Sequence, residues 1–260
     1  MKKTVLYALF FSCLSFSVKA YNVTHDFTVV LGPFSASNAL FNYNITPQSY
    51  EVKSSIETDG IFGSLYPFTA EYLTTGKIKK HTFTTTRYKS YSKSRFNTRN
   101  KEMFYDEKGK PIYRISSKNS LSNKKVEILP PPDNVHTTDL QTVLADIIVQ
   151  YTQLKFCNAR KHVFDGKKRF DIVFNDEGTE ELEANEYSNY SGKAIKCSIY
   201  ADNLGQDYDD LIFSLTPENP IYFWILEDKE TKLPFIAKIE NKSTPLGKLK
   251  VYTQNIHIKE

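Results

Sequence analysis

Short runs of residues that favour β-strands fill most of this chain and constrain its fold more than any other feature. Phe and Tyr occupy 18 and 17 of the 260 positions, and Val, Ile and Thr fill many of the others between turn residues. These side chains suit a pleated, half-buried surface. Turn residues such as Asp59-Gly60, Thr75-Gly76 and Asp165-Gly166 leave only short connections, which indicates antiparallel neighbours. The candidate strands are Asn22–Leu31, Ala36–Thr46, Ser49–Thr58, Phe68–Thr75, Ile78–Tyr88, Ser92–Tyr105, Pro111–Ser117, Lys124–Leu129, Arg160–Phe164, Lys168–Asn175, Ala194–Ala201, Ile221–Glu227, Phe235–Asn241 and Gly247–Ile258.

One segment, Asp139–Leu154, has the period of a helix. Thr138 is the expected N-cap, and Gln141 would complete a capping box. The apolar stripe needs a surface to cover, and one face of the sheet is the simplest partner. The pattern predicts a mainly β fold: a curved antiparallel sheet or barrel-like domain with one long amphipathic helix packed on it. The stripe consists of Leu140, Val143, Leu144, Ile147, Ile148, Tyr151 and Leu154.

The first twenty residues read as a cleavable secretory signal. Lys2 and Lys3 precede a short apolar core, and Val18 and Ala20 stand at the −3 and −1 positions of a small-residue cleavage site. The core is too short to span a bilayer comfortably. Lipidation at Cys13 is the alternative, but apolar residues continue beyond that cysteine. We therefore expect a protein exported to the periplasm, since the short Lys-Lys signal is typical of bacteria.

The remaining residues, 21–260, are expected to form a single mostly β exported domain. About 240 residues suffice for one sizeable core. The run Pro130-Pro131-Pro132 is an alternative domain boundary, but a β half without the helix would expose an apolar sheet face. No later segment approaches 18 consecutive apolar residues, so we expect no transmembrane segment in the mature chain, which is soluble or peripheral to a membrane.

Cys157 and Cys197 remain as an even pair once the signal, with Cys13, is removed. In an oxidising compartment such a pair predicts a disulfide. Two buried free thiols are the alternative. A catalytic cysteine is disfavoured, because only His162 lies near either cysteine in the sequence and that spacing is not diagnostic.

A basic stretch is the most promising binding surface. Residues 77–101 contain nine Lys and Arg and no acid. The functional interpretation is a face that binds anionic lipid head groups or acidic glycan. The alternatives are a solvated outer sheet face, or neutralisation by the acidic segment Asp176–Glu186 folding back onto it. A hairpin near Tyr91–Ser94 would break the shared parity of the candidate ligand-binding residues, which are Arg87, Lys89, Lys93, Arg95, Arg99 and Lys101.

No catalytic residue, metal ligand or cofactor is predicted. The five histidines are scattered without zinc-site spacing, and no nucleophile elbow or phosphate-binding loop occurs. Asp165 and Asp171 could form a paired carboxylate site, but turn chemistry and a cross-strand ion pair explain them better. The acidic loop Asp202–Asp210 lacks EF-hand spacing. Removing Lys2, Lys3 and Lys19 brings the formal charge of +4 to about +1, which argues against nucleic acid as a partner.

Residues 130–174 carry a family resemblance. Pro130-Pro131-Pro132-Asp133 precedes the predicted helix, and Cys157 follows it, before Val163-Phe164-Asp165-Gly166-Lys167-Lys168-Arg169-Phe170-Asp171. Cys197, Leu233-Pro234-Phe235 and Gly247 add to the pattern. This layout resembles the bacterial exported family described as domain of unknown function 3108. The resemblance implies the compartment and the fold class, and no catalytic chemistry comes with it.

Three classes of function compete at this point. The first is a non-catalytic binding or carrier module for a lipid or other envelope amphiphile, because a curved sheet rich in Phe and Tyr can enclose an apolar ligand. The second is a structural or assembly partner of another envelope protein, which would use an exposed strand edge or the basic face. The third is a hydrolase whose motif one sequence does not reveal. The composition favours the first.

Overall fold

A computed structural model describes residues 21–80, 82–120, 124–128, 137–166, 169–202, 215–244 and 247–259. The predicted signal, Cys13, the proline run and most of the acidic loop Asp202–Asp210 lie outside these residues. Strands make up most of the described chain. The elements are β1 (Tyr21–Leu31), β2 (Phe34–Ile45), β3 (Ser49–Thr58), α1 (Gly60–Leu65), β4 (Phe68–Lys79), β5 (Thr82–Ser94), β6 (Thr98–Tyr105), β7 (Pro111–Lys118), β8 (Lys125–Ile128), α2 (Leu140–Leu154), β9 (Ala159–Phe164), β10 (Arg169–Leu182), β11 (Gly192–Asp202), β12 (Ile221–Glu227), β13 (Pro234–Thr244) and β14 (Gly247–Lys259).

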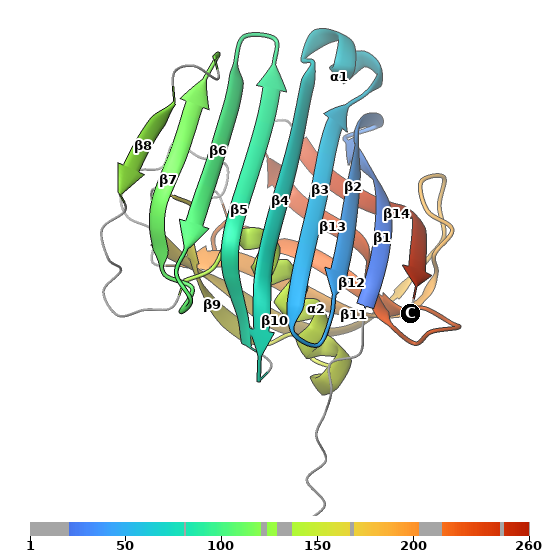
Figure 1. Ribbon diagram of the computed structural model, residues 1–260. Helices are drawn as coiled ribbons and strands as arrows, with labels where there is room; N and C mark the ends of the chain where they lie inside the picture. Colours follow the sequence, from blue (N-terminus) through green and yellow to red (C-terminus); the bar gives the residue numbers. More distant parts are fainter. Residues whose placement is uncertain are drawn as a thin grey trace, which may run out of the picture.

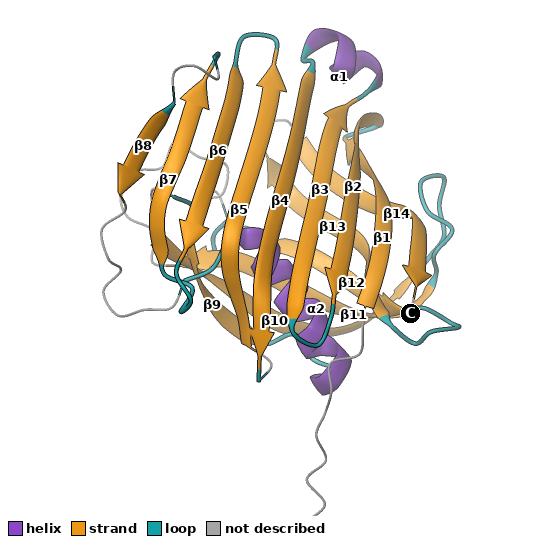
Figure 2. Ribbon diagram, viewed as in Figure 1, coloured by secondary structure: helices purple, strands orange, loops and turns teal. Residues whose placement is uncertain are grey.

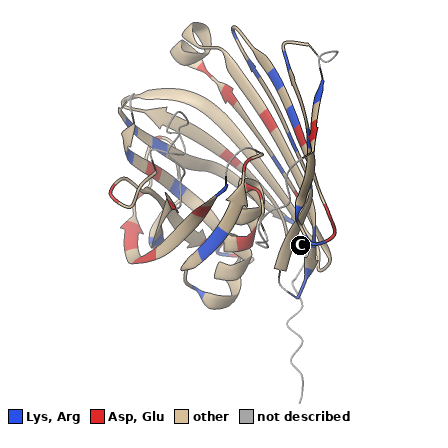
Figure 3. Cartoon of the chain, turned by 90° about the vertical axis from the view of Figure 1, so that its left-hand side faces the viewer, with Lys and Arg blue, Asp and Glu red and all other residues tan. Residues whose placement is uncertain are grey.

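These strands form one antiparallel sheet. Its order is β8-β7-β6-β5-β4-β3-β2-β1-β14-β13-β12-β11-β10-β9. The chain runs as a meander from β1 out to the edge strand β8, crosses through α2 to the opposite edge at β9, and returns until β14 pairs with β1 (Figure 1). The two halves of the sheet face each other as two layers (Figure 3). The prediction of a mainly β, curved antiparallel sheet is therefore confirmed.

The helix α2 lies between the two halves of the sheet (Figure 2). It has 15 residues, so it is of ordinary length rather than the long helix predicted. It is also not simply amphipathic, because enclosure on several sides buries the polar Gln141 and Thr142 together with Val143, Ile147 and Tyr151. No described residue of the helix before Thr152 is exposed. The helix therefore fills the interior of a folded sheet instead of covering one face of it.

The cap of α2 differs from the predicted one. Asp139, not Thr138, is the N-cap, and its side chain accepts hydrogen bonds from the backbone N–H groups of Gln141 and Thr142. Thr138 instead forms an isolated parallel bridge with Val163 at the edge of β9. The Gln141 side chain donates to Ser54 Oγ on β3 at 2.7 Å, so the predicted capping box does not form. Thr138 and Gln141, the two residues that the local pattern assigned to the cap, thus form contacts with the sheet instead.

The main hydrophobic core lies around this helix. It joins Ile147 and Tyr151 of α2 to residues of both sheet halves, such as Val23, Val52 and Phe174. A disulfide connects Cys157, between α2 and β9, to Cys197 on β11, with Cα atoms 6.3 Å apart. The bond agrees with the predicted pairing. It fixes the C-terminal end of the helix to the layer formed by β9–β14.

Some turns lie elsewhere than predicted. Thr75-Gly76 lies inside β4, and Lys80, with a φ of 48°, stands where β4 ends. Asp59 is the N-cap of the short helix α1 rather than part of a turn. Phe164 pairs with Arg169 across the connection that contains the predicted turn residues Asp165-Gly166. The candidate strand Ser92–Tyr105 is divided between β5 and β6.

Gly76 lies inside β4 at a position where neighbouring atoms already occupy the space for a side chain. A Cβ atom there would clash with Tyr50 Cε1 and with the Thr84 carbonyl oxygen. We predict that Gly76→Ala lowers the free energy of unfolding by about 1–3 kcal/mol, the usual cost of overpacking. Denaturant titration checks this. Combined with Tyr50→Leu, the loss should be smaller than the sum of the two single losses, and strict additivity would contradict the proposed contact.

Candidate functional site

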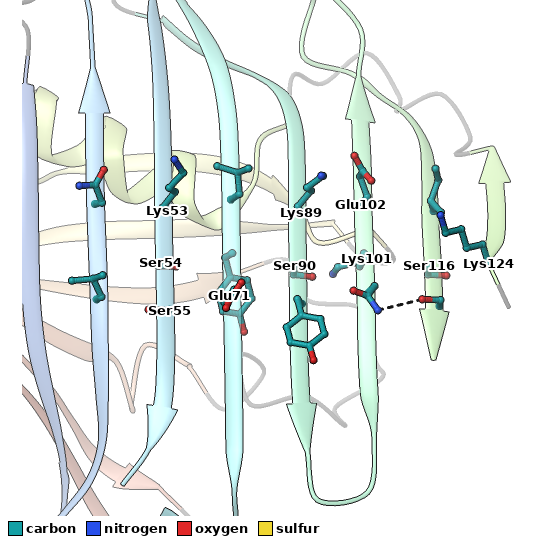
Figure 4. Close-up of a pocket in the computed structure, with 18 residues that line it drawn as sticks. Lys53, Ser54, Ser55, Glu71, Lys89, Ser90, Lys101, Glu102, Ser116 and Lys124 are labelled. Atoms are coloured by element: carbon teal, nitrogen blue, oxygen red, sulfur yellow. Dashed lines mark hydrogen bonds between the residues drawn. The ribbon is translucent and has the colours of Figure 1, made fainter. Parts of the chain in front are cut away.

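A trough of about 660 Å³ crosses the sheet surface formed by β2–β7. It lies on the face turned away from α2, here called the outer face (Figure 4). Two rows of outward-pointing side chains line it, and the backbone between them forms its floor. The lining residues are Leu40, Asn42, Lys53, Ser54, Ser55, Glu71, Tyr72, Leu73, Lys89, Ser90, Tyr91, Asn100, Lys101, Glu102, Ile115, Ser116, Ser117 and Lys124.

Strand register explains how these side chains meet. Directly paired residues point to the same face of a sheet. Lys53 is opposite Leu73, Leu73 is opposite Lys89, Lys89 is opposite Glu102, and Glu102 is opposite Ile115. The second row runs in the same way through Leu40, Ser55, Glu71, Tyr91, Asn100 and Ser117. The first row therefore places the charged side chains beside Leu73 and Ile115, and the second row adds mainly polar side chains.

The charges in the trough are only partly paired. Lys53 bonds to Glu51 at 2.7 Å, and Glu102 is held by Arg87. Lys89, Lys124 and Glu71 have no ionic partner among the described residues. Lys89 and Glu102 lie side by side on neighbouring strands (Figure 4). The trough thus offers cationic groups to a ligand next to Leu73 and Ile115.

The structure does not bring the six predicted basic residues together on one face. Arg87, Lys89 and Lys93 point outward from β5, and Arg95 lies in the turn after it, near the ring of Phe96. Arg99 and Lys101 of β6 pair with Ser92 and Ser90, so they point to the inner face. The six residues do not share a face because this turn separates β5 from β6. From the sequence, a hairpin near Tyr91–Ser94 is the alternative that would have this effect. Acidic and basic residues alternate along this layer (Figure 3).

Lys101 has a structural contact instead. Its Nζ donates to the carbonyl oxygen of Asp165 at 2.8 Å. Arg114 of β7 donates to the next carbonyl, that of Gly166, and pairs with Glu127 of β8. These two cations hold the β9–β10 turn against the inner face of β6 and β7. The Asp-Gly segment that the sequence singled out therefore joins the two sheet halves near their edges.

Asp171 takes part in a cross-strand ion-pair cluster. Its two carboxylate oxygens accept hydrogen bonds from two residues of β9, His162 Nδ1 at 2.6 Å and Arg160 Nη1 at 2.7 Å. Partial burial raises the pKa of Asp171, but the hydrogen bonds from Arg160 and His162 outweigh it and hold this pKa below its usual value. Arg160 also contacts Asp202 at 2.9 Å. The geometry favours the ion-pair interpretation of Asp171 over the paired carboxylate site with Asp165.

The acidic segment Asp176–Glu186 lies on the other half of the sheet. Glu180 pairs with Lys196 at 2.8 Å, and Glu177 accepts a hydrogen bond from Ser198 at 2.6 Å, both on β11. Its later residues line a smaller hollow of about 310 Å³ with Lys238 and Tyr252. These contacts join the segment to β11 and its neighbours rather than to the basic stretch. No group of three metal-binding side chains occurs within the described ranges.

The trough itself was not predicted from the sequence. Only Lys89 and Lys101 belong both to the predicted site residues and to the trough lining. The side chain of Lys101 points to the inner face, away from the trough. Lys53, Glu71, Glu102 and Lys124 were missed. Alternation within each strand indicates which residues share a face, but the alignment of the six strands β2–β7 depends on bulges such as the one at Thr75/Gly76.

Comparison with known proteins identifies the family. The model of the protein family of unknown function DUF3108 matches residues 20–252. The chain belongs to the DUF3108 family. A similar solved structure is the crystal structure of a "Beta-barrel-like Protein of Domain of Unknown Function DUF1849 from Brucella abortus". It shares 8% sequence identity with this DUF3108 chain, has a TM-score of 0.52 and covers 94% of this chain and 99% of its own. This likeness shows a common fold.

No curated protein matches this DUF3108 chain. Among the described residues, no helix has the length and apolar character needed to cross a bilayer. The disulfide is compatible with export. The family and the fold thus agree with the sequence expectations, and the function has to be argued from the trough.

Proposed function

We propose that this protein is a non-catalytic binding or carrier module of the bacterial cell envelope, and that the outer trough takes an anionic amphiphile. The trough carries this proposal, because its volume of about 660 Å³ lies within the range of small-molecule sites. Leu40, Leu73 and Ile115 offer apolar surface to a hydrocarbon chain. Lys89 and Lys124, which have no ionic partner among the described residues, offer their ammonium groups to an acidic head group. Periplasmic localisation, with cleavage after Ala20, completes the proposal.

A lysine next to an anionic head group contributes on the order of 1 kcal/mol. We therefore predict that Lys89→Gln weakens the binding of dodecyl phosphate about fivefold. Isothermal titration calorimetry below the critical micelle concentration measures this affinity. The expected effect is moderate because Lys89 lies on an open surface where water and salt screen its charge.

Lys93→Gln is the matched control. Lys93 lies on the same strand and the same outer face as Lys89, but it does not line the trough. Its replacement should leave the affinity unchanged. An equal loss in both variants would instead indicate a general attraction of the basic stretch, and no loss in either would remove the trough from the proposal.

A structural or assembly role is the second candidate, and one observation favours it. Val126 and Ile128 of β8, an edge strand of the sheet, are 62% and 87% exposed. Large apolar side chains at such exposure on a strand edge are typical of surfaces that pair with another chain. This role is compatible with amphiphile binding, since β8 lies beyond the trough on the same sheet.

A further inference from the structure

Among the described residues, one side of the edge strand β8 has no partner strand. It pairs with β7 through Tyr113–Ile128 and Ser116–Lys125, and no other described strand adjoins it. The opposite edge of the sheet differs. There Thr138 donates to the His162 carbonyl and accepts from the Phe164 N–H, which covers part of the β9 edge. Of the two edges, β8 therefore presents its backbone N–H and C=O groups to a further strand.

The outer face at this edge is apolar. Val126 is opposite Ile115, and Ile128 is opposite Tyr113, whose ring stacks on Phe104 with centroids 4.5 Å apart. The row thus becomes more exposed toward the edge, where Ile128 is 87% exposed. A strand added beside β8 would cover Val126 and Ile128. Burial of such side chains is the main favourable contribution to association.

The charges on the inner face are self-complementary. Lys125 and Glu127 alternate with the apolar residues and lie 2.5 Å apart at their charged ends. In an antiparallel pair of identical strands with Val126 on the two-fold axis, Lys125 of each copy is opposite Glu127 of the other. We propose that β8 pairs in this way with β8 of a second copy, which joins two sheets edge to edge.

The alternative register is unfavourable. Moving the axis by one residue places Glu127 opposite Glu127 of the second copy, and like charges directly opposite are destabilising. It also leaves each Lys125 without a carboxylate across the interface. Charge pairing therefore selects the register centred on Val126. This inference does not depend on the amphiphile proposal, because it rests on β8 alone.

Two complementary charge reversals test the pairing. Lys125→Glu places Glu opposite Glu across the axis, and Glu127→Lys places Lys opposite Lys. Each variant alone should self-associate at least about tenfold more weakly than the parent, as followed by sedimentation velocity of the purified protein. Mixed in equal amounts, the two variants regain opposite charges at both positions. The mixture should dimerise with an affinity within about threefold of the parent.

Val126→Asp provides a second test that leaves the Glu127–Arg114 ion pair in place. It sets two carboxylates together on the axis, so we expect a loss of dimers of at least about tenfold. Ile61→Asp, at a site of similar exposure on α1, is the control and should dimerise like the parent. A parent that is monomeric at every concentration overturns the proposal. So does a Val126→Asp variant that dimerises like the parent, or a mixture that stays monomeric when the parent dimerises.

Discussion

Asp139→Ala is expected to lower the free energy of unfolding by about 4 kcal/mol. The carboxylate of Asp139 is buried and accepts five hydrogen bonds, at distances from 2.7 to 3.2 Å. Its donors are Thr74 on β4, Thr85 on β5, and Gln141 and Thr142 on α2. Removal of the carboxylate leaves these groups without their acceptor inside the core. Each unsatisfied buried donor costs roughly 1–3 kcal/mol before the structure relaxes.

Asp146→Ala is the matched control for this change. Asp146 lies on the same helix, but it is partly exposed and pairs with Lys161 at 2.6 Å. Its loss should cost less than about 1 kcal/mol, as is usual for ion pairs near the surface. Chemical denaturation of both variants gives the comparison. A loss below about 1 kcal/mol for Asp139→Ala would show that the network does not hold the helix to the sheet.

His25 is expected to make the protein labile to acid. Its ring packs among Phe27, Tyr43 and Phe235 with centroid distances of 5.5, 5.9 and 6.3 Å. Neither ring nitrogen has a hydrogen-bond partner among the described residues. Burial away from water lowers the pKa of His25 to about 3. The folded protein therefore keeps this ring neutral over a pH range in which the unfolded chain binds a proton.

The direction of the pH effect follows from this lowered pKa. Above the unfolded value of about 6.5 both states are neutral at this position, and the contribution of His25 to stability is fully present. As the pH falls from 6.5 toward 3, the unfolded state is favoured by up to about 1.4 kcal/mol per pH unit, in total on the order of 5 kcal/mol. Carboxylates with lowered pKa values, such as Asp171, add to the acid lability.

His25→Phe isolates the contribution of this histidine. The variant keeps an aromatic ring in the cluster but removes the titrating group, so its stability should fall less steeply between pH 6.5 and 4 than that of the parent. His257→Gln, which changes an exposed histidine, should follow the parent curve. Parallel curves for the parent and His25→Phe would show that His25 is hydrated or charged in the folded state.

Much of the fold could be predicted from the sequence because strand formation here follows local patterns. Alternation of apolar and polar residues identified strands such as Ser49–Thr58, which the structure reproduces as β3. The helix period identified α2 to within one residue at its start. The cap failed because Thr138 and Gln141 have partners on distant strands, Val163 on β9 and Ser54 on β3. Such contacts depend on tertiary structure, which local spacing does not encode.

The site was harder to predict because it depends on register. Lys89 was among the predicted residues, but its neighbours Lys53 and Leu73 come from strands 16 or more positions away in the sequence. The Lys101 side chain points to the inner face because a hairpin separates β5 from β6, and the sequence left the position of that hairpin open. A single sequence shows which residues of one strand share a face. It does not show how far each strand slides against the next, and that offset decides which side chains line the trough.

Native mass spectrometry of the protein recovered from its cells tests the proposed binding function most directly. The account predicts that the parent carries the additional mass of one amphiphile, which collisional activation releases. Leu73→Ser, which removes apolar surface from the trough, should be recovered mostly without that mass, whereas Ile61→Ser on α1 should retain it. A parent protein recovered only at its bare polypeptide mass, or a Leu73→Ser variant with the same added mass as the parent, would contradict binding in the trough.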